Sequence, residues 1–293
     1  MKRLFLIIFA ITTLIFTSCN NDSKPITSNG DENPITTPNE IVSEQTPEEM
    51  PERETPESIK KPETIEEIIE FTNSLKVNGS MADFSLEGIL ESVQLPESED
   101  AGDEYQSTTA YLGDSVTMGL SFFKNHPAEM VIAKGSINPL DAVEKKLIEL
   151  DDGTFVNFPV ALSKTGAKRA VLTFGSNAIS IMSEETFLKY YIKLLDAIEE
   201  TCPDCDIIIQ SITPLASTCT LKKLTNDLVN RSNLLLLVLA YSRDLKFLDT
   251  TSQMKDSEGY MKLEFCSSDD GIHINQQGYE VWINMLRTHE LKD

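Results

Sequence analysis

The feature that most constrains the fold of this chain is an alternation of short apolar runs with longer amphipathic stretches, which begins near Thr108. Each apolar run is typical of a buried strand, and each amphipathic stretch repeats its apolar residues at helical spacing. The alternation predicts a parallel sheet covered by helices on both faces, in which ligands bind at the carboxyl ends of the strands. Strands are expected over Thr109–Leu112, Met130–Ala133, Ala170–Phe174, Ile207–Gln210 and Lys246–Leu248, and the clearest helices over Glu184–Glu200, Leu221–Tyr241 and Gln276–Arg287.

Residues 1–18 have the pattern of a signal peptide. Two basic residues precede an apolar or hydroxyl run over Leu4–Phe16, which is short for a bilayer span and is followed at once by polar residues. The small residue before Cys19 resembles a bacterial lipobox, in which the cysteine becomes diacylated. We therefore expect a lipid anchor on Cys19, and the alternative is an ordinary signal peptide followed by a chance cysteine.

The composition changes after Cys19. Seven of the 13 prolines lie between Asn20 and Pro62, among many Glu, Thr, Ser and Asn residues and almost no large apolar side chains. Such a segment cannot bury a core, and its proline and acid content favours an extended, solvated chain. Residues 19–62 are therefore interpreted as a tether that holds a folded domain away from the membrane.

Residues 63–107 are predicted to form a helical preface to the main domain. Apolar residues recur among acids over Glu63–Leu75, which fits one amphipathic helix, and Ala82–Val93 fits another. The acidic stretch Pro96–Glu104 is expected to separate these helices from the main domain, residues 108–293. We expect the preface to pack against that domain or to lie loosely on it, without chemistry of its own.

The charge balance argues against a nucleic-acid partner. The chain of 293 residues has 47 acidic and 25 basic side chains, which gives a formal net charge of -22. No basic stripe offsets this charge locally, so the surface would repel a phosphate backbone.

The sequence Gly113-Asp114-Ser115 follows directly after the first expected strand and contains a candidate serine. At a strand-to-helix turn its hydroxyl would be exposed, and its backbone amide would point with the helix N-terminus toward any developing anion. The match is short, and a serine that caps the helix in a turn explains it equally well. Ser115 is thus a candidate nucleophile that needs a partner elsewhere in the chain.

That partner is expected near the other end of the chain, where Asp270 precedes His273 by three residues before the last helix. A carboxylate at this spacing can reach the imidazole Nδ1, fix the tautomer and leave Nε2 free to accept the serine proton. The other two histidines, His126 and His289, have no acid at that spacing. His273 is therefore the candidate base, and Asp270 is the acid that orients it.

Two further residues end strands on the same edge of the predicted sheet. Gly135 follows the second strand and Asn177 follows the third, and acyl transfer needs donors aimed at a tetrahedral oxyanion. The Gly135 amide and the Asn177 side chain could supply them beside the Ser115 amide. Glycine and asparagine are also ordinary turn residues, which explains each position by itself.

Taken together, the motifs Gly-Asp-Ser, Gly, Gly-x-Asn and Asp-x-x-His closely resemble the GDSL or SGNH hydrolase family, over about Ala110 to Leu286. The resemblance implies a flavodoxin-like three-layer α/β/α sandwich with a parallel sheet, the SGNH hydrolase fold, and an enzyme that needs no metal or cofactor. It implies these roles: Ser115 as nucleophile, Gly135 and Asn177 as oxyanion donors, and Asp270 with His273 completing the site.

One position departs from the family pattern, because Ala178 follows Asn177 where the family commonly has Asp. That Asp is not the acid of the proton relay, so the departure concerns local loop geometry. No Gly-x-Ser-x-Gly elbow, His-Glu-x-x-His helix or Gly-x-Gly-x-x-Gly loop occurs in the sequence. An α/β-hydrolase, a zinc peptidase and a dinucleotide-binding protein are therefore without support.

Four cysteines follow the tether, and outside the cytoplasm an even set permits disulfides. Cys202 and Cys205 have C-x-x-C spacing without a second such pair, which favours a local disulfide or free thiols over a redox or metal centre. Cys219 and Cys266 are expected in loops on the carboxyl face of the sheet. We predict a bridge between these two that braces the Asp270 loop, and the alternative is four free thiols.

These features predict a serine ester hydrolase at the cell surface, anchored through its N-terminal lipid with the catalytic domain outside the cytoplasm. Short-chain esters, above all acetyl esters of carbohydrates, are the expected substrates, because a tethered surface enzyme meets acylated polysaccharides. One alternative is an O-acyltransferase that uses the same residues. Another is a non-catalytic surface lipoprotein that binds glycans.

Overall fold

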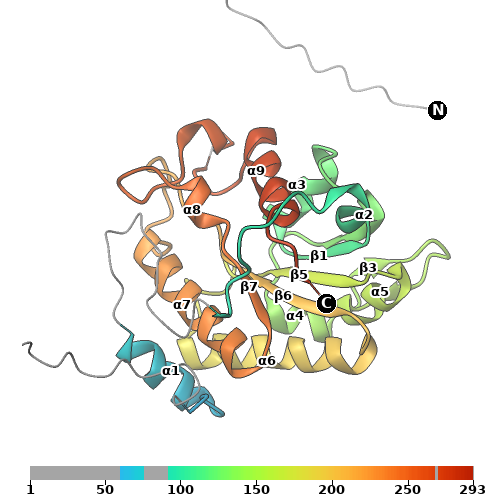
Figure 1. The fold of residues 1–293 in the computed structure, drawn as a ribbon, viewed down its shortest axis with the longest axis horizontal. Coiled ribbons are helices and arrows are strands. Elements are labelled where there is room, and N and C mark those ends of the chain that lie inside the picture. Colours follow the sequence, from blue (N-terminus) through green and yellow to red (C-terminus); the bar gives the residue numbers. More distant parts are fainter. Residues whose placement is uncertain (1–59, 76–91, 268–269, 293) are drawn as a thin grey trace, which may run out of the picture. The chain divides into compact units, whose positions relative to one another are not determined.

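A five-stranded parallel sheet forms the centre of the molecule (Figure 1). The computed structural model describes residues 60–75, 92–267 and 270–292. The sheet has the order β2-β1-β5-β6-β7, and its strands are β1 (Thr109–Gly113), β2 (Val131–Ala133), β5 (Arg169–Thr173), β6 (Asp206–Gln210) and β7 (Lys246–Leu248). Each neighbouring pair is parallel. The five strands predicted from the apolar runs are thus confirmed, each to within one residue of its expected ends.

The predictions for the signal peptide, for Cys19 and for most of the tether concern residues outside the described ranges. Most of Ala82–Val93 also lies outside them. Within the described ranges, no helix combines the length and the apolar character needed to cross a bilayer.

Helices cover both faces of the sheet. Because successive strand residues point to opposite faces, Ala110 and Leu112 of β1 enter one core and Tyr111 enters the other. One layer contains α4 (Pro139–Glu144), α5 (Phe158–Thr165), α6 (Glu184–Thr201) and α7 (Asn226–Ser242), and the other contains α3 (Ser115–Phe122), α8 (Thr251–Met254) and α9 (Gln276–Arg287). The two layers lie on opposite sides of the sheet in Figure 1, which gives the predicted three-layer α/β/α architecture. A small antiparallel hairpin, β3 (Ile148–Glu149) with β4 (Phe155–Val156), joins α4 to α5.

The described part of the preface belongs to the same compact unit as the sheet. Helix α1 (Ile65–Ser74) begins with a capping box, in which Thr64 and Glu67 each accept a hydrogen bond from the other's backbone amide. Its Ile68 is buried in the core beside α6 and α7. The amphipathic pattern of Glu63–Leu75 is therefore a helix, and it packs against the domain.

The end of the preface adds an extended segment beside β7. The Leu95 amide donates to the Phe247 carbonyl at 2.9 Å, and the Phe247 amide donates to the Val93 carbonyl at 3.0 Å. Gln94 forms a parallel bridge with Phe247 at this point. Val93, predicted as the last residue of a helix, lies in a turn, and the chain is extended from Gln94 on, where the edge of β7 supplies hydrogen-bond partners for its backbone.

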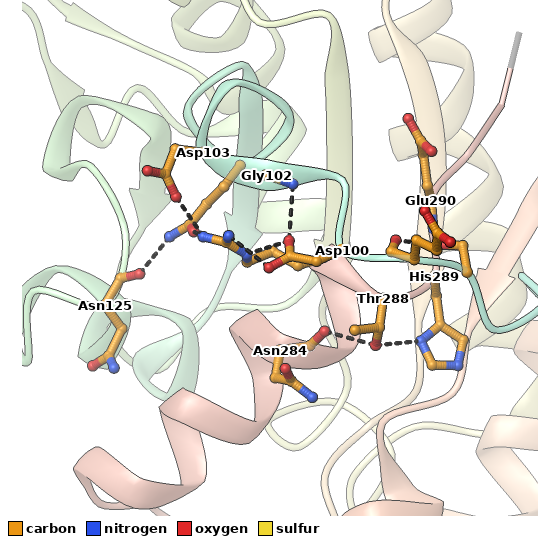
Figure 2. Close-up of polar contacts among 12 residues, drawn as sticks. Asp100, Gly102, Asp103, Asn125, Asn284, Thr288, His289 and Glu290 are labelled. Carbon is orange, nitrogen blue, oxygen red and sulfur yellow. Dashed lines mark hydrogen bonds and ion pairs between the residues drawn. The ribbon is translucent and has the colours of Figure 1, made fainter.

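The acidic stretch Pro96–Glu104, expected between the preface helices and the main domain, packs against the end of α9. The Arg287 guanidinium at the end of α9 binds Asp100 at 2.7 and 2.8 Å and Asp103 at 2.5 Å. The Ala101 amide donates to the Arg287 carbonyl at 2.8 Å. These contacts lie where α2 (Gly102–Ser107) meets the C-terminal end of α9 (Figure 2). Two of its acidic side chains, Asp100 and Asp103, thus bind one arginine of the main domain.

The buried His126 predicts that the fold weakens in acid. Its Nε2 lies 2.7 Å from the Thr109 carbonyl, its ring meets Tyr111 edge-on at 5.2 Å, and burial lowers its pKa from 6.5 to about 4. Between pH 4 and pH 6.5, His126 is protonated in the unfolded chain and neutral in the folded chain. The free energy of unfolding should therefore fall as the pH drops from about 6.5 to about 4, by about 3 kcal/mol from this residue.

Urea unfolding at pH 7 and pH 4.5 checks this expectation, with His126→Gln as the comparison because glutamine Nε2 can still donate to the Thr109 carbonyl. The variant should lose less stability on acidification than the parent protein. Equal losses in the two proteins would contradict the assignment.

Candidate active site

Ser115 is the first residue of α3, and Asp114 alone separates it from the end of β1. The turn is tight, since a Cβ added at Gly113 would lie 2.0 Å from the Thr117 hydroxyl oxygen and 2.2 Å from that of Thr173. Asp114 caps the helix by accepting a hydrogen bond from the Val116 amide at 3.0 Å. The Ser115 hydroxyl, on a half-buried residue, is thereby fixed at the carboxyl edge of the sheet at a helix N-terminus.

His273 meets Ser115 across this edge. Its Nε2 lies 2.9 Å from the Ser115 Oγ, and its Nδ1 lies 2.5 Å from the Asp270 Oδ2. The Tyr279 hydroxyl of α9 donates to the Val116 carbonyl at 2.6 Å. This bond holds α9, which follows the histidine loop, against α3. The structure thus brings together the serine, histidine and aspartate that the sequence predicted, although their separation in the chain is as large as 158 residues.

Asp270 is organised by its own loop. Its Oδ1 accepts hydrogen bonds from the amides of Ile272 at 2.8 Å and His273 at 2.9 Å. Burial acts to raise the pKa of this carboxyl, but those amides and the His273 ring outweigh it and hold the pKa below its ordinary value. An ionised Asp270 therefore faces Nδ1, so that Nδ1 carries the hydrogen and Nε2 is left to accept one.

The predicted oxyanion donors stand on the same edge of the sheet. Asn177 lies in the turn after β5, and its Nδ2 donates to the Asp114 Oδ2 at 3.0 Å. Gly135 lies in the turn after β2, whose last residue, Ala133, pairs in register with Gly113. This arrangement is consistent with both assignments, and the role of the Gly135 amide stays a prediction.

Sequence reasoning missed the part played by Asp114 and Ser176. Asp114 is 0 % exposed, and its Oδ2 accepts from the Ser176 hydroxyl at 2.8 Å as well as from Asn177. Burial raises the pKa of Asp114, and the donors from Ser176, Val116 and Asn177 oppose that shift. The only signal in the sequence was an aspartate in a capping position, which predicts a helix start and nothing more.

The predicted disulfide between Cys219 and Cys266 is not formed, and all four cysteines of the described residues are free thiols. The two loops do approach, since the backbone of Cys219 packs against Gly271. Backbone contacts brace the Asp270 loop instead. The Ser267 amide donates to the His273 carbonyl at 2.7 Å, and the Cys266 thiol donates to the Ser267 carbonyl at 3.1 Å.

Cys202 and Cys205 lie between α6 and β6, and the Cys205 amide donates to the Cys202 carbonyl at 3.0 Å. Burial raises the pKa of the Cys205 thiol to about 12. The thiol is therefore protonated at neutral pH, which makes it a poor nucleophile and a poor metal ligand.

Solved structures with a similar fold include a GDSL-like lipase from Bacteroides thetaiotaomicron VPI-5482. It has a TM-score of 0.46 and 12% identity, over 64% of this chain and 88% of that one. A carbohydrate esterase of family 3 from Talaromyces cellulolyticus has a TM-score of 0.41 and 13% identity, over 61% of this chain and 93% of that one. Neither likeness indicates what the present chain acts on. No protein with a curated description matches the sequence.

The family model for GDSL-like lipases and acylhydrolases matches residues 135–286. This match covers more than half of the chain, from the turn after β2 to the end of α9, and it includes Asn177, Asp270 and His273. Ser115 precedes the matched residues, but in the structure its hydroxyl lies beside His273, which is among them. The chain therefore belongs to the GDSL-like lipase/acylhydrolase family.

Proposed function

We propose that this acylhydrolase cleaves carboxylic esters through an acyl-enzyme formed on Ser115. One observation carries the proposal, namely the continuous contact from the Ser115 Oγ through both nitrogens of His273 to the Asp270 carboxylate. A serine hydroxyl is a weak nucleophile unless a base takes its proton, and a base is effective only when a third group orients it.

The reaction then has two stages, formation of the acyl-enzyme and its hydrolysis. His273 Nε2 takes the proton of the Ser115 hydroxyl as the oxygen attacks the ester carbonyl, and the carbonyl oxygen becomes an oxyanion. The tetrahedral intermediate collapses with loss of the alcohol, which receives that proton from His273. Water then attacks the acyl-enzyme and gives a proton to His273. The second tetrahedral intermediate collapses, Ser115 recovers its proton from His273, and the acid is released. Donors at Ser115, Asn177 and Gly135 would each be worth about 3 kcal/mol of transition-state stabilisation.

For the substrate we propose a short acyl group, such as acetate, on a carbohydrate. A cavity of about 360 Å³ beside the Asp270 loop supports the carbohydrate part, because hydroxyl-bearing residues and Tyr260 line it. Sugars combine hydroxyl groups with apolar C–H faces, which such a lining can contact. The cavity wall is joined to the catalytic loop, since the Ala216 amide donates to the Gly271 carbonyl at 2.9 Å. The lining includes Ser217, Thr220 and Thr225.

The function is tested with p-nitrophenyl esters of increasing acyl length, measured beside the release of acetate from acetylated polysaccharides. Turnover should be highest for acetyl esters and should fall as the acyl chain lengthens. A serine-reactive fluorophosphonate should label the enzyme. Absence of both turnover and labelling would contradict the esterase proposal, and it is the result expected of the non-catalytic alternative. Acylated sugars in place of free acid, after acceptor sugars are added, would mean an O-acyltransferase.

We further propose that a lipid on Cys19 anchors the enzyme at the cell surface, supported by the basic, apolar and small-residue pattern that precedes this cysteine. Replacing Cys19 by alanine should release the protein from the membrane fraction, because the lipid would be the stable anchor once the signal is removed. Fractionation before and after a high-salt wash measures this. A variant that stays with the membranes would contradict the lipid anchor.

A further inference from the structure

A buried carboxylate collects three hydrogen bonds behind the candidate site. The Asp114 Oδ1 accepts from the Val116 amide, and its Oδ2 accepts from the Ser176 hydroxyl at 2.8 Å and the Asn177 amide nitrogen at 3.0 Å. The residue is entirely screened from solvent. A group buried this completely keeps its partners in one arrangement, because an unpaired donor or acceptor there would lose its hydrogen bond without gaining one from water.

The carboxylate decides which end of the Asn177 carboxamide faces it. A carboxylate only accepts hydrogen bonds, so the nitrogen end of Asn177 must turn toward Asp114 and the oxygen end away from it. The nitrogen carries two hydrogens, and the bond to Asp114 uses one. The other is left to donate to an oxyanion. With the opposite orientation, the carboxamide oxygen would meet both the carboxylate and the oxyanion, and it would repel both.

We propose that Asp114 is the positioning residue of the oxyanion hole, which acts through Asn177 by fixing the direction of its amide. The proposal rests on the proposed function, since it names how one of the oxyanion donors is oriented. The Ser176 hydroxyl shares the Asp114 Oδ2 and fills the second acceptor position on that oxygen. The family's usual aspartate after the asparagine is here the buried Ala178, and the carboxylate that contacts Asn177 is the one before the serine.

Asp114→Asn tests the proposal because asparagine caps a helix as well as aspartate does. Its Oδ1 would keep the Val116 amide, so its Nδ2 would face Ser176 and Asn177. The serine hydroxyl can rotate to accept, but Asn177 must turn its oxygen toward the new amide, which places an acceptor at the oxyanion. We expect kcat to fall about a hundredfold to a thousandfold with little change in KM, at least as far as in Asn177→Ala.

A double-mutant cycle separates positioning from an independent role. If Asp114 acts through Asn177, the variant that carries both Asp114→Asn and Asn177→Ala should be no slower than Asp114→Asn alone. If the two residues act independently, the two losses should multiply, and that outcome would overturn the proposal. Thr64→Ala is the matched control, because it removes a cap from α1 without touching the site and should leave kcat unchanged.

A measurement that needs no turnover distinguishes failure of this inference from failure of the proposed function. In the protein labelled with 15N at asparagine, the side-chain resonances of Asn177 are those that vanish in Asn177→Ala. They should move in Asp114→Asn and stay in place in Thr64→Ala. Unmoved resonances would overturn the positioning role even if the enzyme is active. An inactive parent protein whose resonances do move would overturn the esterase proposal alone.

Discussion

Replacing Ser115 by alanine should lower ester hydrolysis by about a thousandfold or more and leave the fold intact. The serine oxygen is the atom that would bond to the acyl group, and the half-buried side chain leaves no large cavity when it is shortened. His273→Ala should cost about as much, and the double variant should be little worse than either single one. Nucleophile and base act as a unit, so their losses do not multiply.

Steady-state kinetics on a p-nitrophenyl ester, with thermal unfolding of each variant, measure this expectation. Ser121→Ala is the matched control, because it removes a serine hydroxyl from the same helix. That hydroxyl donates to the Met118 carbonyl at 2.8 Å. That variant should retain the parent rate. A folded Ser115→Ala enzyme with near-parent turnover would end the acyl-enzyme proposal.

The second large effect is expected at Gly271, between the aspartate and the histidine of the site. Its φ is +72°, and a Cβ added there would lie 2.4 Å from the backbone nitrogen of Cys219 and 2.6 Å from its Cα. The neighbouring backbone is not free to give way, because the Ala216 amide holds the Gly271 carbonyl at 2.9 Å. Alanine would therefore push the loop that carries Asp270 and His273 off its support.

We expect Gly271→Ala to lower the free energy of unfolding by about 3 kcal/mol and kcat by about a hundredfold, since a displacement of about 1 Å is enough for such a loss. Gly153→Ala is the control. Its φ is +80°, but an added Cβ there meets nothing within 4 Å. It should show only the cost of the left-handed backbone, about 1 kcal/mol, at the parent rate. Chemical denaturation and kinetics compare the two, and equal effects would contradict the clash with Cys219.

Local patterns predicted the strands and the contact between Asp270 and His273, because both depend on short stretches of sequence. The residues of β1 and β5 are all buried, so their apolar runs stood out. Asp270 and His273 interact across three residues, and the loop between them sets their contact without help from distant parts of the chain. Helix α7 begins at Asn226 rather than Leu221, because Thr225 supplies the N-cap and the residues before it form turns.

What the sequence did not reveal depends on partners far along the chain. Asp100 reads as part of an acidic linker until its partner Arg287 is found 187 residues away. The pairing of the chain after Val93 with β7 depends on Phe247, which lies more than 150 residues further along the chain. The role of Asp114 required the direction of the Asn177 amide, which no spacing encodes. Each omission is a long-range contact between groups that are common in loops.

The clasp between Asp100, Asp103 and Arg287 has a mechanical consequence. Any pull applied through the N-terminal part of the chain reaches the domain first at α1, where it packs on α6 and α7, then at the segment beside β7, and then at this clasp, on the far end of α9 from His273. The load is shared among several hydrogen bonds at one border of the fold. It enters the protein without passing through the turn between β1 and α3 or the loop between Asp270 and His273, so the reactive groups keep their spacing while the chain is under tension.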